Sequence, residues 1–300
     1  MPSLLQRYPV SLETVRRAAN RLKREVLAIG PLRRINDRRH ETHRRRHAPS
    51  LPALSAADAA FVERLDREGA LVVPLTSLGL PGTGEMTAAA LALVPELKAR
   101  PRNGDIAVRL PLQRLAEQGG IWRWGIQHRL LDLVENYLGV PVWYHGADIR
   151  QEIANGEVSD VRQWHRDAED YRMFKIILYL NDVPDGAGGP FTYLDRAQTL
   201  AACDRLRYVS GFVPDARMEQ AVPRSLWRQA TGPGLTAAVA DTCNVFHRAG
   251  APTARDRFSV TFSFTSRAPA KTYATLGFTP GQLRTLQEGL DERQRSCIPG

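Results

Sequence analysis

His165-Arg166-Asp167 places an imidazole and a carboxylate two residues apart. Residues i and i+2 of a β-strand project from the same side, so a strand here turns His165 and Asp167 toward one cavity and Arg166 away from it. His247 lies 80 residues beyond Asp167, and a jelly roll brings strands at such separations together. Two histidines and one carboxylate are the ligand set of non-haem Fe(II) sites, which keep open positions for a co-substrate and O₂. The sequence therefore predicts a metal site formed by His165, Asp167 and His247.

A second cluster of polar residues begins ten residues past His247, where Arg257-Phe-Ser opens an alternating segment that runs to Phe264. Arg257 and Ser259 share one face of this predicted strand, and bulky apolar residues share the other. A buried arginine is costly unless its charge is paired. A carboxylate of 2-oxoglutarate pairs it bidentately, and Ser259 can add a hydrogen bond. The alternative is a salt bridge with a protein carboxylate, and Arg255 is the nearest competing arginine.

Lys175 lies on another predicted strand, on the face that carries Ile177 and Tyr179. Two positions remain open for its side chain. It either points inward and binds an anionic group of oxoglutarate or of a substrate, or it lies at the rim of a barrel. With the first option, the expected co-substrate contacts are Arg257, Ser259 and Lys175.

The rest of the chain divides into a helical first half and a strand-rich second half. Capping and periodicity signals predict helices at Ala56–Glu68, Met86–Lys98, Ile126–Leu138 and, near the end, Thr279–Arg293. Extended segments are predicted at Ala70–Pro74, Val140–Arg150, Phe174–Leu180, Phe191–Leu194, Ala237–Ala240 and Arg257–Phe264. This order predicts an α+β chain whose second half is an antiparallel barrel or jelly roll.

Positive charge is concentrated at the N-terminus. Residues 1–50 hold 13 of the 41 Lys and Arg residues but only 4 of the 32 Asp and Glu residues, so the net charge of +9 belongs to this segment and residues 51–300 are balanced. We therefore expect a basic extension, 1–50, followed by a main domain, 51–300. The high pI therefore comes from the extension and does not indicate that the main domain binds nucleic acid.

Within the extension, Ser11 can cap a helix that runs to about Ile29 and ends at Gly30-Pro31. The run Arg33–His47 is rich in arginine and is expected to be solvated or loosely ordered. A different role is contact with an acidic partner, which includes nucleic acid and an anionic membrane surface. The sequence leaves both roles open.

Composition places the chain among ordinary globular proteins, because 43% of its residues are hydrophobic and 24% are charged. The longest apolar stretch, Ala88–Pro95, is far shorter than a membrane span, and the N-terminus shows no secretory signal pattern. Cys203, Cys243 and Cys297 are odd in number and widely spaced, as expected for free thiols in a reducing cytoplasm. We therefore expect a cytoplasmic protein.

Four segments together resemble the phytanoyl-CoA dioxygenase family of Fe(II)- and 2-oxoglutarate-dependent oxygenases, and the resemblance runs from about Ser55 to Arg267. They are Gln163–Asp170, Lys175–Asp182, Gly188–Leu194 and Ala240–Ala249. The resemblance implies a double-stranded β-helix (a cupin-like jelly roll) with flanking N-terminal and C-terminal helices. It also implies iron on His165, Asp167 and His247, oxoglutarate on Arg257, and O₂ as the second co-substrate. One departure is Asp195-Arg-Ala-Gln198, where many members read Pro-Gly-Ser/Thr-His.

The resemblance implies an enzyme that releases succinate and CO₂ while oxidising a small or medium organic molecule. Related halogenases have a small residue where this chain has Asp167, so hydroxylation is expected, with desaturation or ring formation as variants. Two other functions remain open on the sequence. One is a jelly-roll module that binds metal or ligand without turnover. The other is an oxygenase that the basic extension recruits to nucleic acid or to a membrane. The oligomeric state is not indicated.

Overall fold

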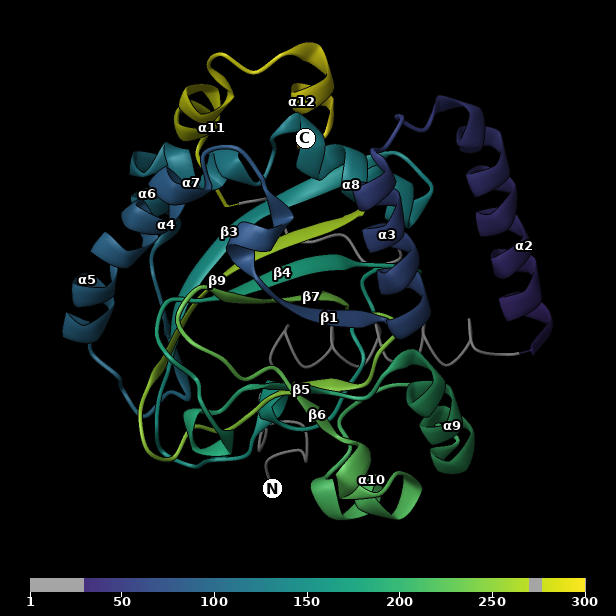
Figure 1. The fold of residues 1–300 in the computed structure, drawn as a ribbon, viewed down its shortest axis with the longest axis vertical. Helices are drawn as coiled ribbons and strands as arrows, with labels where there is room; N and C mark the ends of the chain where they lie inside the picture. The colour runs from purple at the N-terminus through teal and green to yellow at the C-terminus, as the bar shows by residue number, and fades with distance from the viewer. Residues whose placement is uncertain (1–29, 270–276, 300) are drawn as a thin grey trace, which may run out of the picture.

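Two antiparallel β-sheets form the centre of the molecule in the computed structural model, which describes residues 30–269 and 277–299. The larger sheet has the strand order β1-β7-β4-β9-β3-β2 and the smaller has β6-β5-β8. The strands are β1 Ala70–Pro74, β2 Ala107–Arg109, β3 Val142–Glu152, β4 Phe174–Tyr179, β5 Phe191–Tyr193, β6 Arg228–Gln229, β7 Thr236–Asp241, β8 His247–Ala249 and β9 Arg257–Ser266. Figure 1 shows the larger sheet across the middle, with β5 and β6 below it.

The chain alternates between the two sheets as a jelly roll does. It passes from β3 in the larger sheet to a bridge between His165 and His247 at the edge of the smaller one, and then returns to β4. β5, β6 and β8 belong to the smaller sheet, whereas β7 and β9 belong to the larger. This alternation is that of a double-stranded β-helix, so the predicted α+β fold with a jelly-roll core is confirmed.

Helices cover the outer face of the larger sheet and the ends of the molecule (Figure 1). Buried apolar side chains of α4, α7 and α8 pack with those of β3, β4 and β9 in one core cluster, and a second cluster fills the space between the sheets. The helices are α2 Gly30–His47, α3 Ala56–Glu68, α4 Thr83–Ala92, α5 Val94–Ala99, α6 Leu112–Glu117, α7 Gly119–Trp124, α8 His128–Leu138, α9 Arg196–Leu206, α10 Asp215–Ala221, α11 Pro280–Gln287 and α12 Glu292–Ser296. Short 3₁₀ turns are η2 Ala48–Ser50, η3 Leu75–Leu78, η4 Asp160–Arg162, η5 Gly186–Gly188 and η6 Arg224–Leu226.

Helix boundaries follow local capping signals, and two predicted helices are wrong in extent. α3 has the predicted bounds, with Ser55 as its N-cap and Gly69 at φ 80° as its C-cap. The predicted helix Met86–Lys98 is broken into α4 and α5 at Leu93, just before a proline that suits a first turn. The helix predicted to reach Arg293 ends at Gln287, and a separate capping box at Asp291 opens α12.

The segment Asp195–Gln198, where the sequence departs from the family that it resembles, has a local structural role. Asp195 accepts a hydrogen bond from the Gln198 backbone N–H at 2.8 Å, and the Gln198 side chain accepts one from the Asp195 N–H at 3.3 Å. The pair is a capping box that opens α9. The segment is therefore a helix start in this chain.

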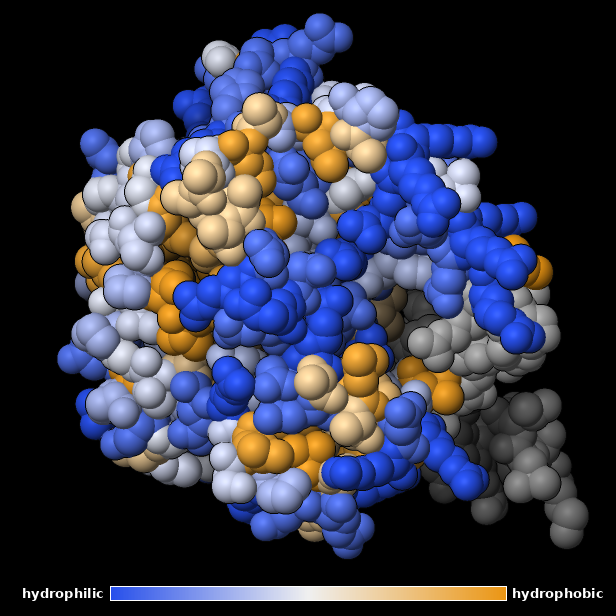
Figure 2. Space-filling model, turned by 45° about the vertical axis from the view of Figure 1, so that its right-hand side comes forward, coloured by the Kyte–Doolittle hydropathy of each residue, from blue (hydrophilic) through white to orange (hydrophobic). Residues whose placement is uncertain are grey.

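Arg33–His47, predicted to be solvated or loosely ordered, is ordered as part of helix α2, and most of its described side chains are exposed. Gly30-Pro31 lies in the first turn of this helix. His40 stacks on Tyr171 with ring centroids 4.3 Å apart, and His47 Nε2 lies 2.8 Å from Glu135 Oε1. The half-buried stripe at helical spacing consists of Asn36, His40, Arg44 and His47. The exposed residues of α2 are mostly hydrophilic, as the upper right of Figure 2 shows for the side in view, and Ile35 is an exception at 48% exposed. The helix predicted for Ser11–Ile29 lies outside the described residues.

Two further features concern the class of protein. Among the described helices, none combines the length and the apolar composition that a membrane crossing needs. Cys203, Cys243 and Cys297 are unpaired, and the last two are buried.

Gly125 is required where α7 meets β3, because a Cβ there would lie 2.3 Å from the hydroxyl of the buried Tyr144. Gly125→Ala should therefore lower the free energy of unfolding by about 1–3 kcal/mol in urea titrations. Gly120→Ala is the matched control, since a Cβ added at Gly120 would meet nothing within 4 Å. Its effect should be neutral or stabilising by up to about 1 kcal/mol. Equal destabilisation by both variants contradicts the packing constraint.

Candidate metal centre

The two histidines are held opposite each other by the backbone. The His165 N–H donates to the His247 carbonyl at 2.9 Å, and the His247 N–H donates to the His165 carbonyl at 2.9 Å. The sequence pattern predicted a strand at His165. The structure has an isolated bridge to His247 there, and His165 does not belong to a longer strand. The Asp167 N–H donates to the Thr242 carbonyl at 2.9 Å, which fixes the third residue against the loop that leads into β8.

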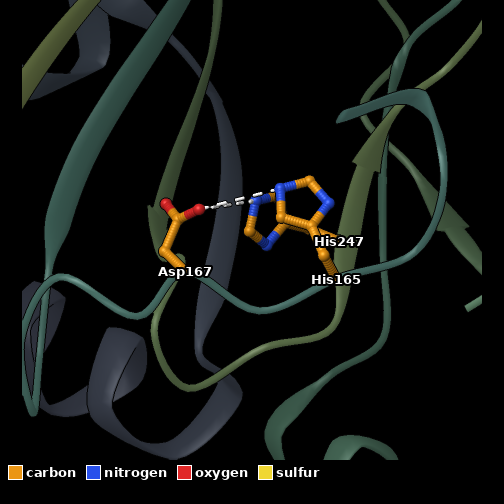
Figure 3. Close-up of side chains that lie close together, drawn as sticks. All are labelled: His165, Asp167 and His247. Carbon is orange, nitrogen blue, oxygen red and sulfur yellow. Dashed lines mark ion pairs between the residues drawn. The ribbon is translucent and has the colours of Figure 1, made fainter. Parts of the chain in front are cut away.

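Both imidazoles are oriented by their own backbone. His165 Nδ1 lies 2.9 Å from the Gln163 carbonyl oxygen, and His247 Nδ1 lies 3.2 Å from that of Val245. A carbonyl oxygen only accepts, so each Nδ1 is a donor, and the Nε2 of a neutral ring is the nitrogen that keeps a lone pair for a metal. Both Nε2 atoms then face Asp167 Oδ1, at 3.7 Å from His165 and 3.8 Å from His247 (Figure 3).

These three ligand atoms lie within 4.8 Å of one another. Neutral imidazole nitrogens and a carboxylate oxygen on one side of a cavity form a facial set that suits Fe(II) and leaves its other positions open. The donor set therefore fits the predicted metal. Among the residues that the structure describes, no other group of three His, Cys, Asp or Glu has this arrangement.

Lys175 points into the cavity, as one sequence alternative described, but its partner in the structure is a protein carboxylate. Its Nζ lies 2.5 Å from Asp167 Oδ2, so it points inward and pairs with a ligand of the predicted metal site. β4 places it there, opposite Ser263 of β9 and Ala240 of β7. The two oxygens of the Asp167 carboxylate therefore have different contacts: Oδ2 binds the lysine, and Oδ1 faces the two imidazoles.

The protonation states of two ligands suit a metal. Burial opposes ionisation of Asp167, but the charge of Lys175 and the two histidines outweigh it and hold the pKa of this carboxyl far below its usual range. Burial, followed by the neighbouring His165, lowers the pKa of His247 to about 3. His247 is therefore neutral near pH 7, as a metal ligand must be.

A cavity of about 450 Å³ opens in front of these residues. The predicted residues His165, Asp167, His247, Lys175 and Arg257 all line it. His145 lines it as well, with Nε2 2.7 Å from Thr265 Oγ1, and burial, followed by Lys175, lowers its pKa to about 4. The fold therefore brings the metal ligands and the arginine to one space.

Arg257 is 3% exposed and only partly satisfied by the protein. Its Nη2 lies 3.9 Å from Glu152 Oε1, which is too long for a hydrogen bond, and its Nε and Nη1 are buried without a partner among the described residues. The guanidinium also lies over the Tyr179 ring, 5.7 Å from its centroid. Buried donors without partners indicate a ligand that supplies acceptors. Arg255, the competing arginine, is exposed and lines a separate groove.

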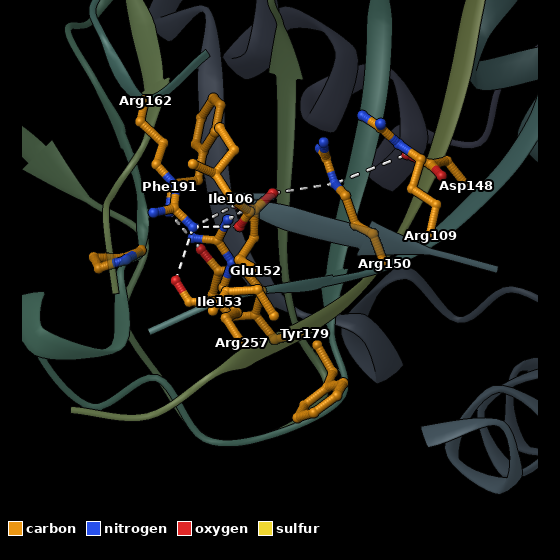
Figure 4. A network of polar contacts seen from close by, with 12 residues as sticks. Ile106, Arg109, Asp148, Arg150, Glu152, Ile153, Arg162, Tyr179, Phe191 and Arg257 are labelled. Carbon is orange, nitrogen blue, oxygen red and sulfur yellow. Dashed lines mark hydrogen bonds and ion pairs between the residues drawn. The ribbon is translucent and has the colours of Figure 1, made fainter. Parts of the chain in front are cut away.

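Ser259 lies on the same strand face, is 1% exposed and has no hydrogen bond from Oγ to a described residue. It is not among the residues that line the cavity. Sequence reasoning missed Glu152 and Arg162, which lie behind Arg257 (Figure 4). Arg162 is fully buried and donates to Asn155 Oδ1 at 2.7 Å and to three backbone carbonyls. Glu152 and Arg162 are ten residues apart, and no pattern in a single sequence indicates that two such residues form a buried ion pair.

No protein-family model matches the chain, and no curated protein matches it. Several solved structures have a similar arrangement. HygX from Streptomyces hygroscopicus, with nickel, 2-oxoglutarate and hygromycin B bound, has 15% identity, a TM-score of 0.47, and coverage of 71% of this chain and 88% of that chain. The non-heme alpha ketoglutarate dependent epimerase SnoN from nogalamycin biosynthesis has 20% identity, a TM-score of 0.47, and coverage of 75% and 88%.

EctD from S. alaskensis, with 2-oxoglutarate and 5-hydroxyectoine, has 20% identity, a TM-score of 0.43, and coverage of 71% of this chain and 76% of that chain. Each of these three proteins binds or depends on 2-oxoglutarate, and HygX also holds a metal. Values this low do not assign an activity to this chain. Its function is therefore inferred from its own residues.

Lys175→Met tests the pairing with Asp167. The metal-free variant keeps a buried carboxylate without its partner, so its free energy of unfolding should fall by about 3 kcal/mol. Added Mn(II) then supplies the missing positive charge, and it should raise the melting temperature more in the variant than in the unsubstituted protein. Thermal melts of EDTA-treated protein, with and without Mn(II), measure both effects.

Lys98→Met is the control, since Lys98 is exposed and lies over the Phe258 ring instead of beside a ligand. A Mn(II) shift that is the same in all three proteins means that Lys175 does not balance the charge of Asp167.

Proposed function

We propose that this protein is an Fe(II)- and 2-oxoglutarate-dependent oxygenase. The observation that carries the proposal is the facial set of His165, Asp167 and His247 in the same cavity as the buried, unsatisfied donors of Arg257. A metal site alone fits many functions. A metal site beside a cavity arginine whose donors lack partners fits a chelating acid with a second carboxylate, which is what 2-oxoglutarate is.

The residues have separate roles in this proposal. Bound Fe(II) supplies the redox chemistry by which 2-oxoglutarate and O₂ give succinate and CO₂ while the second oxygen atom enters the substrate. His165, Asp167 and His247 hold the metal on one side, and Lys175 keeps Asp167 Oδ2 out of the remaining positions. Arg257 orients the co-substrate through its far carboxylate, and Ser259, with its unsatisfied Oγ on the same strand face, is proposed as a further contact.

Hydroxylation of a small or medium organic molecule is the proposed outcome. The cavity of about 450 Å³ has room for a co-substrate and part of a molecule of that size. Asp167 occupies the position at which a halogenase needs space, which favours oxygenation. The rival function, a binding module without turnover, requires no O₂-dependent product, so the two can be separated by measurement.

Arg257→Gln tests the co-substrate contact. The substitution removes charge-assisted hydrogen bonds to a carboxylate, so the dissociation constant of 2-oxoglutarate should rise about tenfold or more while metal binding is retained. Anaerobic titration of the Fe(II) protein, followed through its visible charge-transfer band, gives the constant. Arg255→Gln removes an equal charge from an exposed site and should change the constant less than about twofold. Equal weakening by both variants refutes the role of Arg257.

Asp167→Ala tests whether the site turns over. The unsubstituted protein with Fe(II) and 2-oxoglutarate should form succinate slowly in air even without a substrate, and the variant should form none, because it lacks one metal ligand. Mass spectrometry of succinate measures this. Asp105→Ala, at an exposed aspartate, should behave as the unsubstituted protein. Succinate formation by Asp167→Ala excludes Asp167 as a ligand, and a charge-transfer band without any succinate supports the binding module.

A further inference from the structure

A row of alternating charges lines the cavity wall beyond Arg257 (Figure 4). Arg109 Nε lies 3.3 Å from Asp148 Oδ2, and Arg150 Nε lies 3.8 Å from the same oxygen and 3.6 Å from Glu152 Oε1. The edge strand β2 contributes Arg109, and β3 contributes the other three residues. Arg109, Asp148 and Arg150 all line the cavity.

Arg150 is the least satisfied member of this row. Its side chain is 18% exposed, both of its ion pairs are longer than a hydrogen bond, and its buried Nε has no hydrogen-bond partner among the described residues. Arg162 lies on the other side of Glu152, and both of its Nη atoms donate to acceptors of the protein. Arg150 therefore has donors directed along the cavity wall that the surrounding protein does not use.

The charges of the row, taken together with the two further arginines beside Glu152, do not balance. Arg109, Arg150, Arg162 and Arg257 are four cations, and Asp148 and Glu152 are two anions, which leaves a net charge of +2. The far carboxylate of 2-oxoglutarate on Arg257 neutralises one unit. Asp167 and Lys175 neutralise each other, so they do not offset the remainder. One positive charge is left in this group, and besides Arg257 its cations that line the cavity are Arg150 and Arg109.

Partly exposed apolar side chains lie along the same cavity and beside its metal ligands. Leu112 is 38% exposed and Val161 is 37% exposed, and both line the cavity. Phe212 is 46% exposed, and its ring lies edge-on to the His165 ring at 5.3 Å. Exposed apolar groups beside a cationic wall suit a molecule with an apolar body and one anionic group.

We propose that the substrate is an amphipathic organic anion whose carboxylate or sulfate group binds Arg150 and Arg109, and whose apolar part lies against Leu112 and Val161 near the metal. This inference rests on the proposed function, because it takes Arg257 as the co-substrate site. It assigns the two arginines on the cavity wall to the two reactants, with Arg257 for 2-oxoglutarate and Arg150 for the substrate.

Hexanoate, hexyl sulfate and neutral hexanamide are suitable probes, tested on protein loaded with Mn(II) and saturating 2-oxoglutarate. Paramagnetic broadening of the probe's methyl signal in NMR reports binding close to the metal, and Zn(II)-loaded protein corrects for other effects. At least one anion should bind about tenfold more tightly than hexanamide, since a charge-assisted contact is lost in the amide. Preference for hexanoate or for hexyl sulfate tells which anionic group the site takes.

Arg150→Gln should reduce anion binding to the level of hexanamide and leave the dissociation constant of 2-oxoglutarate within about threefold. Arg109→Gln, at a 60% exposed side chain that should not affect folding, should weaken anion binding to a smaller degree. Arg102→Gln is the matched control, because Arg102 is exposed and pairs with Asp256 outside this cavity.

The proposal is overturned if neither anion is preferred over hexanamide, or if Arg150→Gln weakens 2-oxoglutarate as strongly as Arg257→Gln does, since Arg150 then serves the co-substrate. An equal loss of anion binding in Arg102→Gln also overturns it. Failure of the proposed function has a different signature, because the unsubstituted protein then fails to bind 2-oxoglutarate in the presence of Mn(II).

Discussion

The pair of hydrogen bonds between the backbones of His165 and His247 is the constraint on which the site depends. Each residue donates to and accepts from the other at 2.9 Å, so two ligands 82 residues apart in sequence form one rigid unit. The bridge also extends the smaller sheet by one position, which means that closing the jelly roll and assembling the site are the same event. Both imidazoles take their orientation from carbonyls two residues earlier, so the Nε2 atoms converge without help from distant side chains.

The second constraint is electrostatic and lies at the far end of the cavity. Glu152 is fully buried, and three arginines surround it. Burial alone raises the pKa of Glu152, but Arg150, Arg257 and Arg162 outweigh it, so the net shift is downward and the carboxylate stays charged. One anion cannot satisfy three guanidinium groups. Both Nη atoms of Arg162 find acceptors in Asn155 and the backbone, whereas no hydrogen bond from the side chain of Arg257 or Arg150 to a described residue is present. Buried donors without protein partners require an explanation, and a ligand in the cavity that Arg257 and Arg150 line supplies one.

The sequence predicted what depends on local pattern. Periodicity and caps gave α3 and β1 their observed bounds, and the His-x-Asp spacing identified residues that do converge. It failed where a signal is short or non-apolar. β8 has three residues, too few for alternation to show. The inner stripe of α2 is Asn36, His40, Arg44 and His47, so hydrophobic periodicity cannot detect that this helix packs. The partner of Lys175 depends on how close β4 lies to the loop that carries Asp167. That distance cannot be inferred from the pattern of a single sequence.

Pairing Asp167 with Lys175 has a consequence for how the site is prepared for metal. A site whose ligands must first lose protons binds metal with strong pH dependence. Here Lys175 keeps the carboxylate ionised before any metal arrives, and burial keeps His247 neutral. The same lysine occupies Oδ2, so the carboxylate is restricted to one coordinating oxygen, and the positions that a bidentate aspartate would block stay open. The charge of Lys175 is therefore neutralised by Asp167. The other cations that line the cavity are arginines on β9, β3 and β2, where the two organic reactants are proposed to bind.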